Sequence, residues 1–131
     1  MKKNLLIAIA MLATQFIFSQ ASLNAIKSLP INYEDAEVKP EFPGGYNEFM
    51  KFIAKNFKTP EVEGLSGIVK ISFVVETSGK ISEIKILKDI GSGAAEEAVR
   101  VVSKSPNWSP GEQDGKPVRV TFQLPITIRG Y

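Results

Sequence analysis

Carboxylates and serine hydroxyls are the side chains whose chemistry has to be weighed first, because the chain contains no His and no Cys. The absence of thiols and imidazoles excludes disulfides, thiol nucleophiles, imidazole bases and the usual zinc or copper sites. A serine nucleophile would need activation by a lysine, in a geometry that the sequence does not indicate.

Three polar clusters could suggest catalysis or ligand binding, and each has a structural alternative. Glu96 and Glu97 are adjacent, so on a helix they point about 100° apart and cannot face each other across a substrate. The acidic stretch 34–37 lacks the spacing of a calcium loop, and the Gly-Ser-Gly stretch at 91–93 lacks the rest of a nucleotide-binding signature. We therefore predict that the protein is not an enzyme and uses no metal or cofactor.

The start of the chain differs from the rest. The whole sequence has 131 residues, of which 44% are hydrophobic, as expected for one globular domain. Lys2 and Lys3 precede a largely apolar run at 5–18, and small residues follow it, which is the layout of a secretory signal peptide. As a helix this run would span about 21 Å of a hydrocarbon core of ~30 Å. We predict a signal peptide at 1–21, with a short N-terminal anchor as the alternative.

Removal of this leader balances the charge of the chain. The leader holds two of the 16 Lys and Arg residues and none of the 14 Asp and Glu residues. The remainder then carries 14 positive and 14 negative side chains, which gives no electrostatic reason to expect nucleic acid as a partner. A membrane is a partner only if the leader is retained.

Two helices are predicted from apolar periodicity, at 45–57 and at 94–104. In the first, Tyr46, Phe49 and Ile53 belong to one apolar stripe, and the second carries a stripe of alanines and valines. The small alanines favour close packing of the second helix on a sheet.

Two strands at 69–75 and 81–88 alternate apolar and polar residues. The tight turn between them contains Gly79, which can adopt a positive φ angle, so the two strands are predicted to form a hairpin. In the second strand, Ile84 and Ile86 are expected to face the core.

The clearest pattern lies at the end of the chain, from 118 to 128. Every even position is large and apolar, which indicates a strand with one buried face. Pro125 cannot donate to a ladder and therefore favours an edge position or a strand end. Before these elements, residues 22–41 are predicted to form a lead-in segment with a short strand near 31–33, and residues 42–131 the domain.

The predicted fold class is α+β, with the element order helix, strand, strand, helix, strand. A three-stranded antiparallel sheet with two helices on one face satisfies this order. We expect the strand order 2-1-3, which places the last strand beside the first.

A series of short motifs, in this order and spacing, resembles the C-terminal domain of TonB proteins, in the variant common in Bacteroidetes. The motifs are Phe42-Pro43-Gly44-Gly45, Gly67-Ile68-Val69, Phe73-Val74-Val75, Gly79-Lys80-Ile81, Glu97-Ala98-Val99-Arg100-Val101-Val102, Pro106-Asn107-Trp108-Ser109-Pro110-Gly111, Gly115-Lys116-Pro117-Val118 and Leu124-Pro125-Ile126. Together they span most of the chain that follows the leader.

The resemblance implies a periplasmic domain that binds the TonB box, a short extended segment of outer-membrane transporters, as a strand added beside its last strand. This agrees with the edge position inferred from Pro125. The bound segment is then expected to lie along Arg119, Thr121, Gln123, Pro125 and Thr127.

Three alternatives remain open at this stage. A retained leader would make the protein a short energy transducer, anchored in the inner membrane and facing the periplasm. The last strand could instead pair with a second copy of the chain, which would give a homodimer. Finally, an edge that carries Pro125 and Arg119 could be protected against any pairing.

Overall fold

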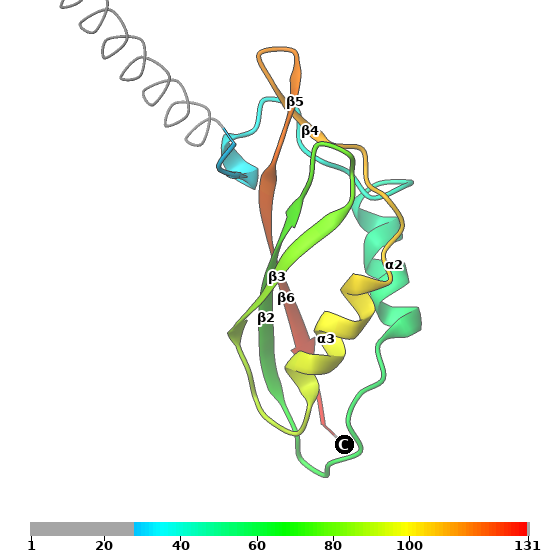
Figure 1. Cartoon of the computed structure of the whole chain (residues 1–131). Coiled ribbons are helices and arrows are strands. Elements are labelled where there is room, and N and C mark those ends of the chain that lie inside the picture. Colours follow the sequence, from blue (N-terminus) through cyan, green and yellow to red (C-terminus); the bar gives the residue numbers. More distant parts are fainter. Residues whose placement is uncertain (1–27, 131) are drawn as a thin grey trace, which may run out of the picture.

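The sheet is built on a ladder between β2 (Gly67–Val75) and β6 (Val120–Ile128), which pair antiparallel along their whole length. β3 (Ile81–Lys88) lies on the other side of β2, and β1 (Ile31–Asn32) lies on the other side of β6. The strand order is therefore β1-β6-β2-β3. Figure 1 shows β2, β3 and β6 as the long strands of this sheet.

This structure is a computed structural model that describes residues 28–130. The signal peptide predicted at 1–21 lies outside the described residues. The remaining elements are the 3₁₀ turn η1 (Tyr33–Asp35) and a small two-stranded sheet of β4 (Gly111–Gln113) and β5 (Lys116–Val118). Within the described range, no helix is long and apolar enough to span a membrane.

The prediction of a three-stranded antiparallel sheet is wrong in one respect, because the sheet has a fourth strand. β1 pairs parallel with β6, with Ile31 opposite Val120 and Asn32 opposite Thr121. A short strand was predicted near 31–33 and is found there. Nothing local to it indicates a partner at the far end of the chain, so its place in the main sheet was not predicted. The three antiparallel strands follow the predicted order, with β6 beside β2.

The last strand begins later than predicted, because the chain breaks between β5 and β6 at Arg119. Val118 continues the apolar alternation of β6 but belongs to the β4–β5 hairpin. Asp114 and Gly115 close that hairpin with φ angles of 52° and 74°, as a tight turn with two positive φ angles requires. Alternation alone therefore did not reveal the break.

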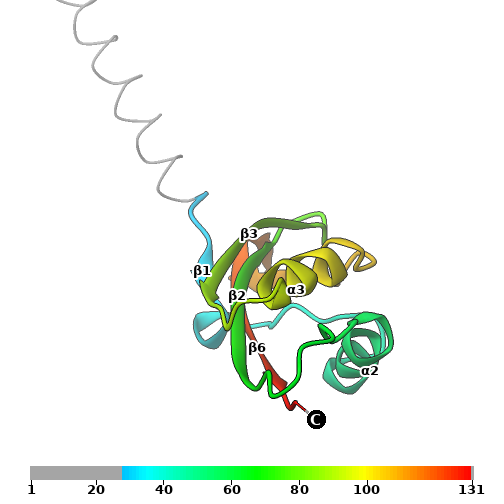
Figure 2. The same ribbon diagram turned by 90° about the horizontal axis from the view of Figure 1, so that it is seen from below.

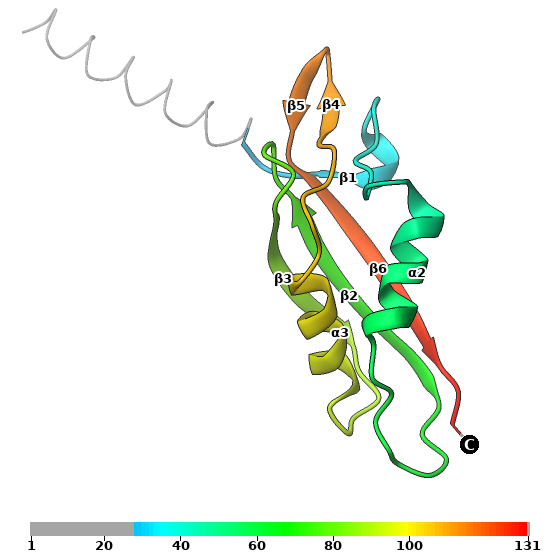
Figure 3. The same ribbon diagram turned by 90° about the vertical axis from the view of Figure 1, so that its right-hand side faces the viewer.

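Helices α2 (Tyr46–Asn56) and α3 (Ala94–Ser103) cover the same face of the sheet, as predicted (Figures 2 and 3). α3 lies against β2 and β3, and Ala94, Ala95 and Ala98 are fully buried in this contact. Small side chains allow a helix to approach a sheet closely, so the alanines determine how near α3 lies.

Two side chains expected in the core lie on the surface instead. Tyr46 is 61% exposed and Ile86 is 45% exposed. Ile86 belongs to β3, the outermost strand, where irregular pairing between β2 and β3 shifts the register. Tyr46 is the first residue of α2, and it lines a pocket described below.

The core is organised around a group of aromatic rings. Phe49 of α2 lies 4.8 Å from Trp108, 6.1 Å from Phe122 and 6.3 Å from Phe73, measured between ring centroids. Phe73 and Phe122 face each other across the β2–β6 ladder, with their centroids 5.4 Å apart. These rings connect the first helix, the two central strands and the loop that holds Trp108.

Gly79 fixes this loop to the hairpin turn. Its carbonyl accepts a hydrogen bond of 2.8 Å from the backbone N–H of Trp108. Its φ angle is 87°, and a Cβ atom at this position would lie 2.0 Å from the Trp108 carbonyl oxygen. Only glycine fits this close approach.

We predict that Phe49→Ala destabilises the domain by about 3–5 kcal/mol, because it removes a fully buried ring from the aromatic group. Urea unfolding followed by tryptophan fluorescence measures this loss. Tyr46→Ala, three residues earlier on the same helix, is the matched control and should change stability by less than about 0.5 kcal/mol, because its ring is exposed. Equal losses for the two variants would contradict this account of the core.

Candidate functional site

β6 has a neighbouring strand along its full length on one side and along only its first two residues on the other. The ladder with β2 includes every residue of β6. On the opposite side, β1 pairs with Val120 and Thr121 only. No other strand or bridge of the described residues lies against that side. Residues 122–128 therefore form an unpaired sheet edge, which we call the free edge.

The direction of the backbone groups along this edge follows from one hydrogen bond. Ile31 N–H donates to the Arg119 carbonyl oxygen at 3.0 Å, so that carbonyl points toward β1. In a strand, the N–H and C=O groups of every second residue point to the same side. Gln123, Pro125 and Thr127 thus present their backbone groups at the free edge. Because proline has no N–H, the edge offers two donors and three acceptors.

Four of the five predicted binding residues lie on β6: Thr121, Gln123, Pro125 and Thr127. Their side chains alternate with the buried apolar ones, and the last three are exposed. Thr121 is paired with Asn32 of β1, so it is not part of the free edge. The structure therefore brings three of the predicted residues together on the unpaired segment.

Arg119, the fifth predicted residue, lies just before β6 and is engaged with the protein itself. Its Nε donates to Glu76 Oε1 at 2.8 Å, and its Nη2 donates to Glu83 Oε2 at 2.8 Å. Its Nη1 donates to the Ser28 carbonyl oxygen at 2.9 Å. Arg119 thereby holds together the end of β2, the start of β3 and the chain that leads into β1.

This arrangement changes the acidity of Glu76. The hydrogen bond from Arg119, together with a second one from the Ser82 hydroxyl, holds the pKa of Glu76 below its ordinary value of 4.5. Partial burial opposes the effect without cancelling it. The same pairing raises the pKa of Arg119, so both groups are charged at neutral pH.

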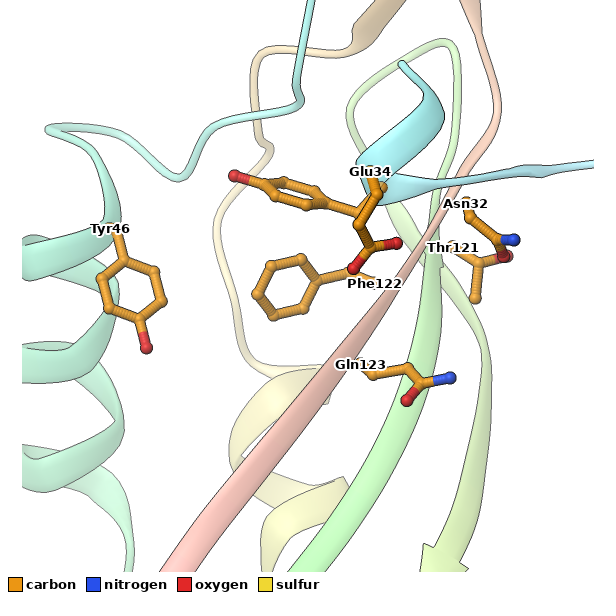
Figure 4. Close-up of a pocket in the computed structure, with 7 residues that line it drawn as sticks. Asn32, Glu34, Tyr46, Thr121, Phe122 and Gln123 are labelled. Atoms are coloured by element: carbon orange, nitrogen blue, oxygen red, sulfur yellow. The ribbon is translucent and has the colours of Figure 1, made fainter.

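A pocket of about 430 Å³ opens beside the first residues of the free edge. Its walls come from β1, η1, α2 and β6, which are far apart in the sequence (Figure 4). The residues that line it are Asn32, Tyr33, Glu34, Tyr46, Thr121, Phe122 and Gln123. Tyr46 lies on one side of the pocket, and Glu34 and Phe122 lie on the other (Figure 4).

Five of these residues, the first four and Phe122, were not predicted as site residues. Phe122 had been assigned to the buried face of the last strand. Tyr46 matched the apolar stripe of a helix, and Glu34 belonged to an acidic stretch that had been weighed only as a calcium site. Asn32 and Tyr33 lie in a segment without periodicity. The signal available in the sequence was a lead-in segment with polar and aromatic residues, together with a predicted edge strand. This signal does not indicate a pocket unless the fold is known.

The other candidate clusters have structural roles. Glu97 accepts hydrogen bonds from Arg100 Nε at 2.9 and 3.0 Å and from the Lys58 backbone N–H at 3.2 Å. Arg100 Nη2 also donates to the Asn56 carbonyl oxygen at 2.8 Å, at the C-terminal end of α2. This pair ties the two helices together. Among residues 28–130, no three acidic side chains are grouped so that they could hold a metal ion.

The profile of the family described as "Gram-negative bacterial TonB protein C-terminal" matches residues 61–128, which is more than half of the chain. The chain belongs to this family. No curated protein and no solved structure matches the chain.

Membership in the TonB C-terminal family ties the domain to TonB-dependent transport, and the family is periplasmic and non-enzymatic. The match runs from just before β2 to the end of β6, so it includes the free edge. β1, η1 and α2 precede it, and with them four of the five pocket residues that sequence analysis missed; the fifth, Phe122, lies within the match. The Bacteroidetes-type variant stays a prediction.

We predict that Glu76→Gln lowers the free energy of unfolding by about 1 kcal/mol at neutral pH, because it removes a charged partner of Arg119. The folded-state pKa of Glu76 is depressed, so its stabilisation is present above pH 4.5 and is lost as the pH falls through the folded-state value. The difference in the free energy of unfolding between wild type and variant should therefore disappear in acid. Urea unfolding across a pH series measures this difference.

The matched control for this series is Glu48→Gln, because Glu48 pairs only with the exposed Lys51 on the surface of α2. The free energy of unfolding of this control variant should stay close to that of wild type at every pH. A gap for Glu76→Gln that persisted unchanged in acid would show that the carboxylate charge does not carry the stabilisation.

Proposed function

We propose that this domain binds an extended segment of a TonB-dependent outer-membrane transporter, which adds as a strand along the free edge of β6. The observation that carries the proposal is that residues 122–128 pair with β2 on one side and with no described strand on the other. Family membership supports it, because TonB C-terminal domains interact with such transporters in general.

The free edge has the chemistry that strand addition needs. An added segment gains hydrogen bonds from its backbone, which supplies affinity without regard to its exact sequence. Gln123 and Thr127 each offer a donor and an acceptor, and Pro125 offers its carbonyl. The side chains of the segment alternate, so that half of them face the helices and half face the exposed side of the sheet.

The edge is only partly protected against pairing. Proline on an edge strand is a common safeguard against unwanted pairing, and Pro125 removes one outward donor from the middle of the free edge. The donors of Gln123 and Thr127 remain on either side of it. Binding therefore requires a segment long enough to reach both, which favours one register over a short nonspecific contact.

β1 sets the limit of the bound segment. It lies on the same side of β6 and reaches as far as Thr121. A segment that adds without displacing β1 must therefore begin beside Phe122, and Thr121 is not available to it. The lead-in chain covers the start of this side of β6 and leaves the rest open.

We also propose that residues 1–21 export the protein to the periplasm and are then removed. Mapping the N-terminus of the protein purified from its native cells tests this, and we expect a start at Ala21 or Ser22. A start at Met1 would favour the alternative of a short inner-membrane transducer.

We predict that Gln123→Pro lowers the affinity for TonB-box peptides at least about tenfold, because it removes an outward N–H and places a ring against the bound backbone. The fold should persist, since the strand already accommodates Pro125. Fluorescence anisotropy with labelled transporter segments measures the affinity.

Gln123→Ala is the control, because it removes the side chain but keeps the backbone donor. Its affinity should stay within about threefold of wild type, and an equal loss in both variants would contradict recognition through the backbone.

Light scattering over a concentration series separates the homodimer alternative. A dimer that Gln123→Pro dissociates, together with no peptide binding, would favour pairing between two copies of β6.

A further inference from the structure

We propose that the pocket at the start of the free edge receives a positively charged side chain, arginine or lysine, of the bound segment. This inference rests on the proposed strand addition and deepens it, because it names a feature by which the domain would select among transporter segments. The pocket volume of about 430 Å³ lies in the range of small-ligand sites, about 300–1,000 Å³, and admits a long side chain.

The charge of the pocket carries the proposal. Among the residues that the structure describes, Glu34 is the only charged one that lines the pocket, and no lysine or arginine does. Glu34 is exposed, and within residues 28–130 its carboxylate forms no ion pair and accepts no hydrogen bond. An unpaired carboxylate beside aromatic walls attracts a cation and repels an acidic side chain.

The nearest lysine is already engaged. Lys39 Nζ donates to the carbonyl oxygens of Tyr33 at 3.0 Å, Glu34 at 3.4 Å and Ala36 at 3.4 Å, which holds the η1 turn in place. The same ammonium lies 5.0 Å from the centroid of the Tyr33 ring. The Tyr33 ring thus already takes part in one cation–π contact, while Lys39 itself does not line the pocket.

The aromatic walls suit a cation with a long apolar stem. Tyr33 packs edge-on against Phe122, with ring centroids 5.1 Å apart, which fixes one wall. Tyr46, on the opposite side, is 61% exposed and makes no ring contact with another described aromatic residue. A guanidinium or ammonium can lie over such rings while its methylene groups cover their apolar surface. Arginine is the better fit, because its planar group stacks and is weakly hydrated.

Strand addition delivers a side chain to this place. Phe122 is the first residue of the free edge and its ring faces the helices, so the first helix-facing side chains of the added segment lie next to the pocket. Asn32, Tyr33, Glu34 and Tyr46 precede the part of the chain that matches the family. The ladder is thus a property of the matched region, and the selective pocket is built largely by the segment before it.

The experiment uses capped eight-residue peptides of alternating Thr and Val, in which one residue, moved through successive positions, is Arg, Lys, Gln or Glu. Affinities are measured by calorimetry at low salt on the purified protein. At one position, we expect the Arg peptide to bind about three- to tenfold more tightly than the Gln peptide, and the Glu peptide to bind least. In Glu34→Gln the preference for Arg over Gln should fall to about twofold or less.

Asp35→Asn is the matched control, because it makes the same charge change one residue away, on a side chain that does not line the pocket. It should retain the Arg preference, and Tyr46→Ala should reduce it. One outcome would overturn the pocket proposal and leave strand addition standing. In it, all peptides bind and Gln123→Pro weakens their binding, but the Arg peptide is not preferred at any position. An equal effect of Asp35→Asn and Glu34→Gln would also overturn it. If no peptide binds at any concentration, strand addition fails and the pocket proposal fails with it.

Discussion

The antiparallel ladder between β2 and β6 is the constraint on which the rest of the structure depends. It places Phe73 opposite Phe122, and these two rings form the part of the core on which Phe49 and Trp108 pack. Because side chains alternate along a strand, a slip of one residue would expose every apolar residue of β6, so burial fixes the register. With β2 paired on both sides, the sheet can extend only at β3 or at β6.

Arg119 decides where β6 begins. The alternation of apolar residues continues from Val118 into β6, yet Arg119 turns its side chain to Glu76 and Glu83 and ends the β4–β5 hairpin. Its bond to the Ser28 carbonyl draws the lead-in chain to the same place. Arg119 and Glu76 form an ion pair with both side chains only 25% exposed, so the start of β6 is fixed by side chains and not by the ladder alone.

The parts of the fold that could be predicted are those in which a periodic pattern of apolar residues extends over many positions. The helices α2 and α3, the β2–β3 hairpin and the even positions of β6 follow from repeating apolar residues, which bury one face whatever the distant contacts are. The short strand predicted near 31–33 is present as β1, but its partner at the far end of the chain has no local signal. Tyr46 shows a second limit: its spacing matches the buried stripe, but the first turn of α2 extends to the rim of the pocket. The free edge was therefore predictable from Pro125, and the pocket beside it was not.

One side of β6 is paired at its start and open along the rest because β1 is so short. Two paired residues give little ladder energy, and β1 is kept in place mainly by the Ile31 N–H bond to Arg119, the Arg119 bond to Ser28 and the packing of Tyr33 on Phe122. The first of these is a backbone hydrogen bond and the other two involve side chains. They reach only Arg119 and Phe122, and none of them involves Gln123, Pro125 or Thr127. The chain thus closes the part of the edge where its own carboxylates and guanidinium meet, and leaves open the part whose outward groups are backbone donors and acceptors. β1 ends at Asn32, and η1 follows with the ring of Tyr33 packed on Phe122. The pocket lies beside this turn, with Tyr46 of α2 on its other side (Figure 4). The pocket is consequently the geometric result of a self-paired strand stopping short, which is why edge and pocket occur together.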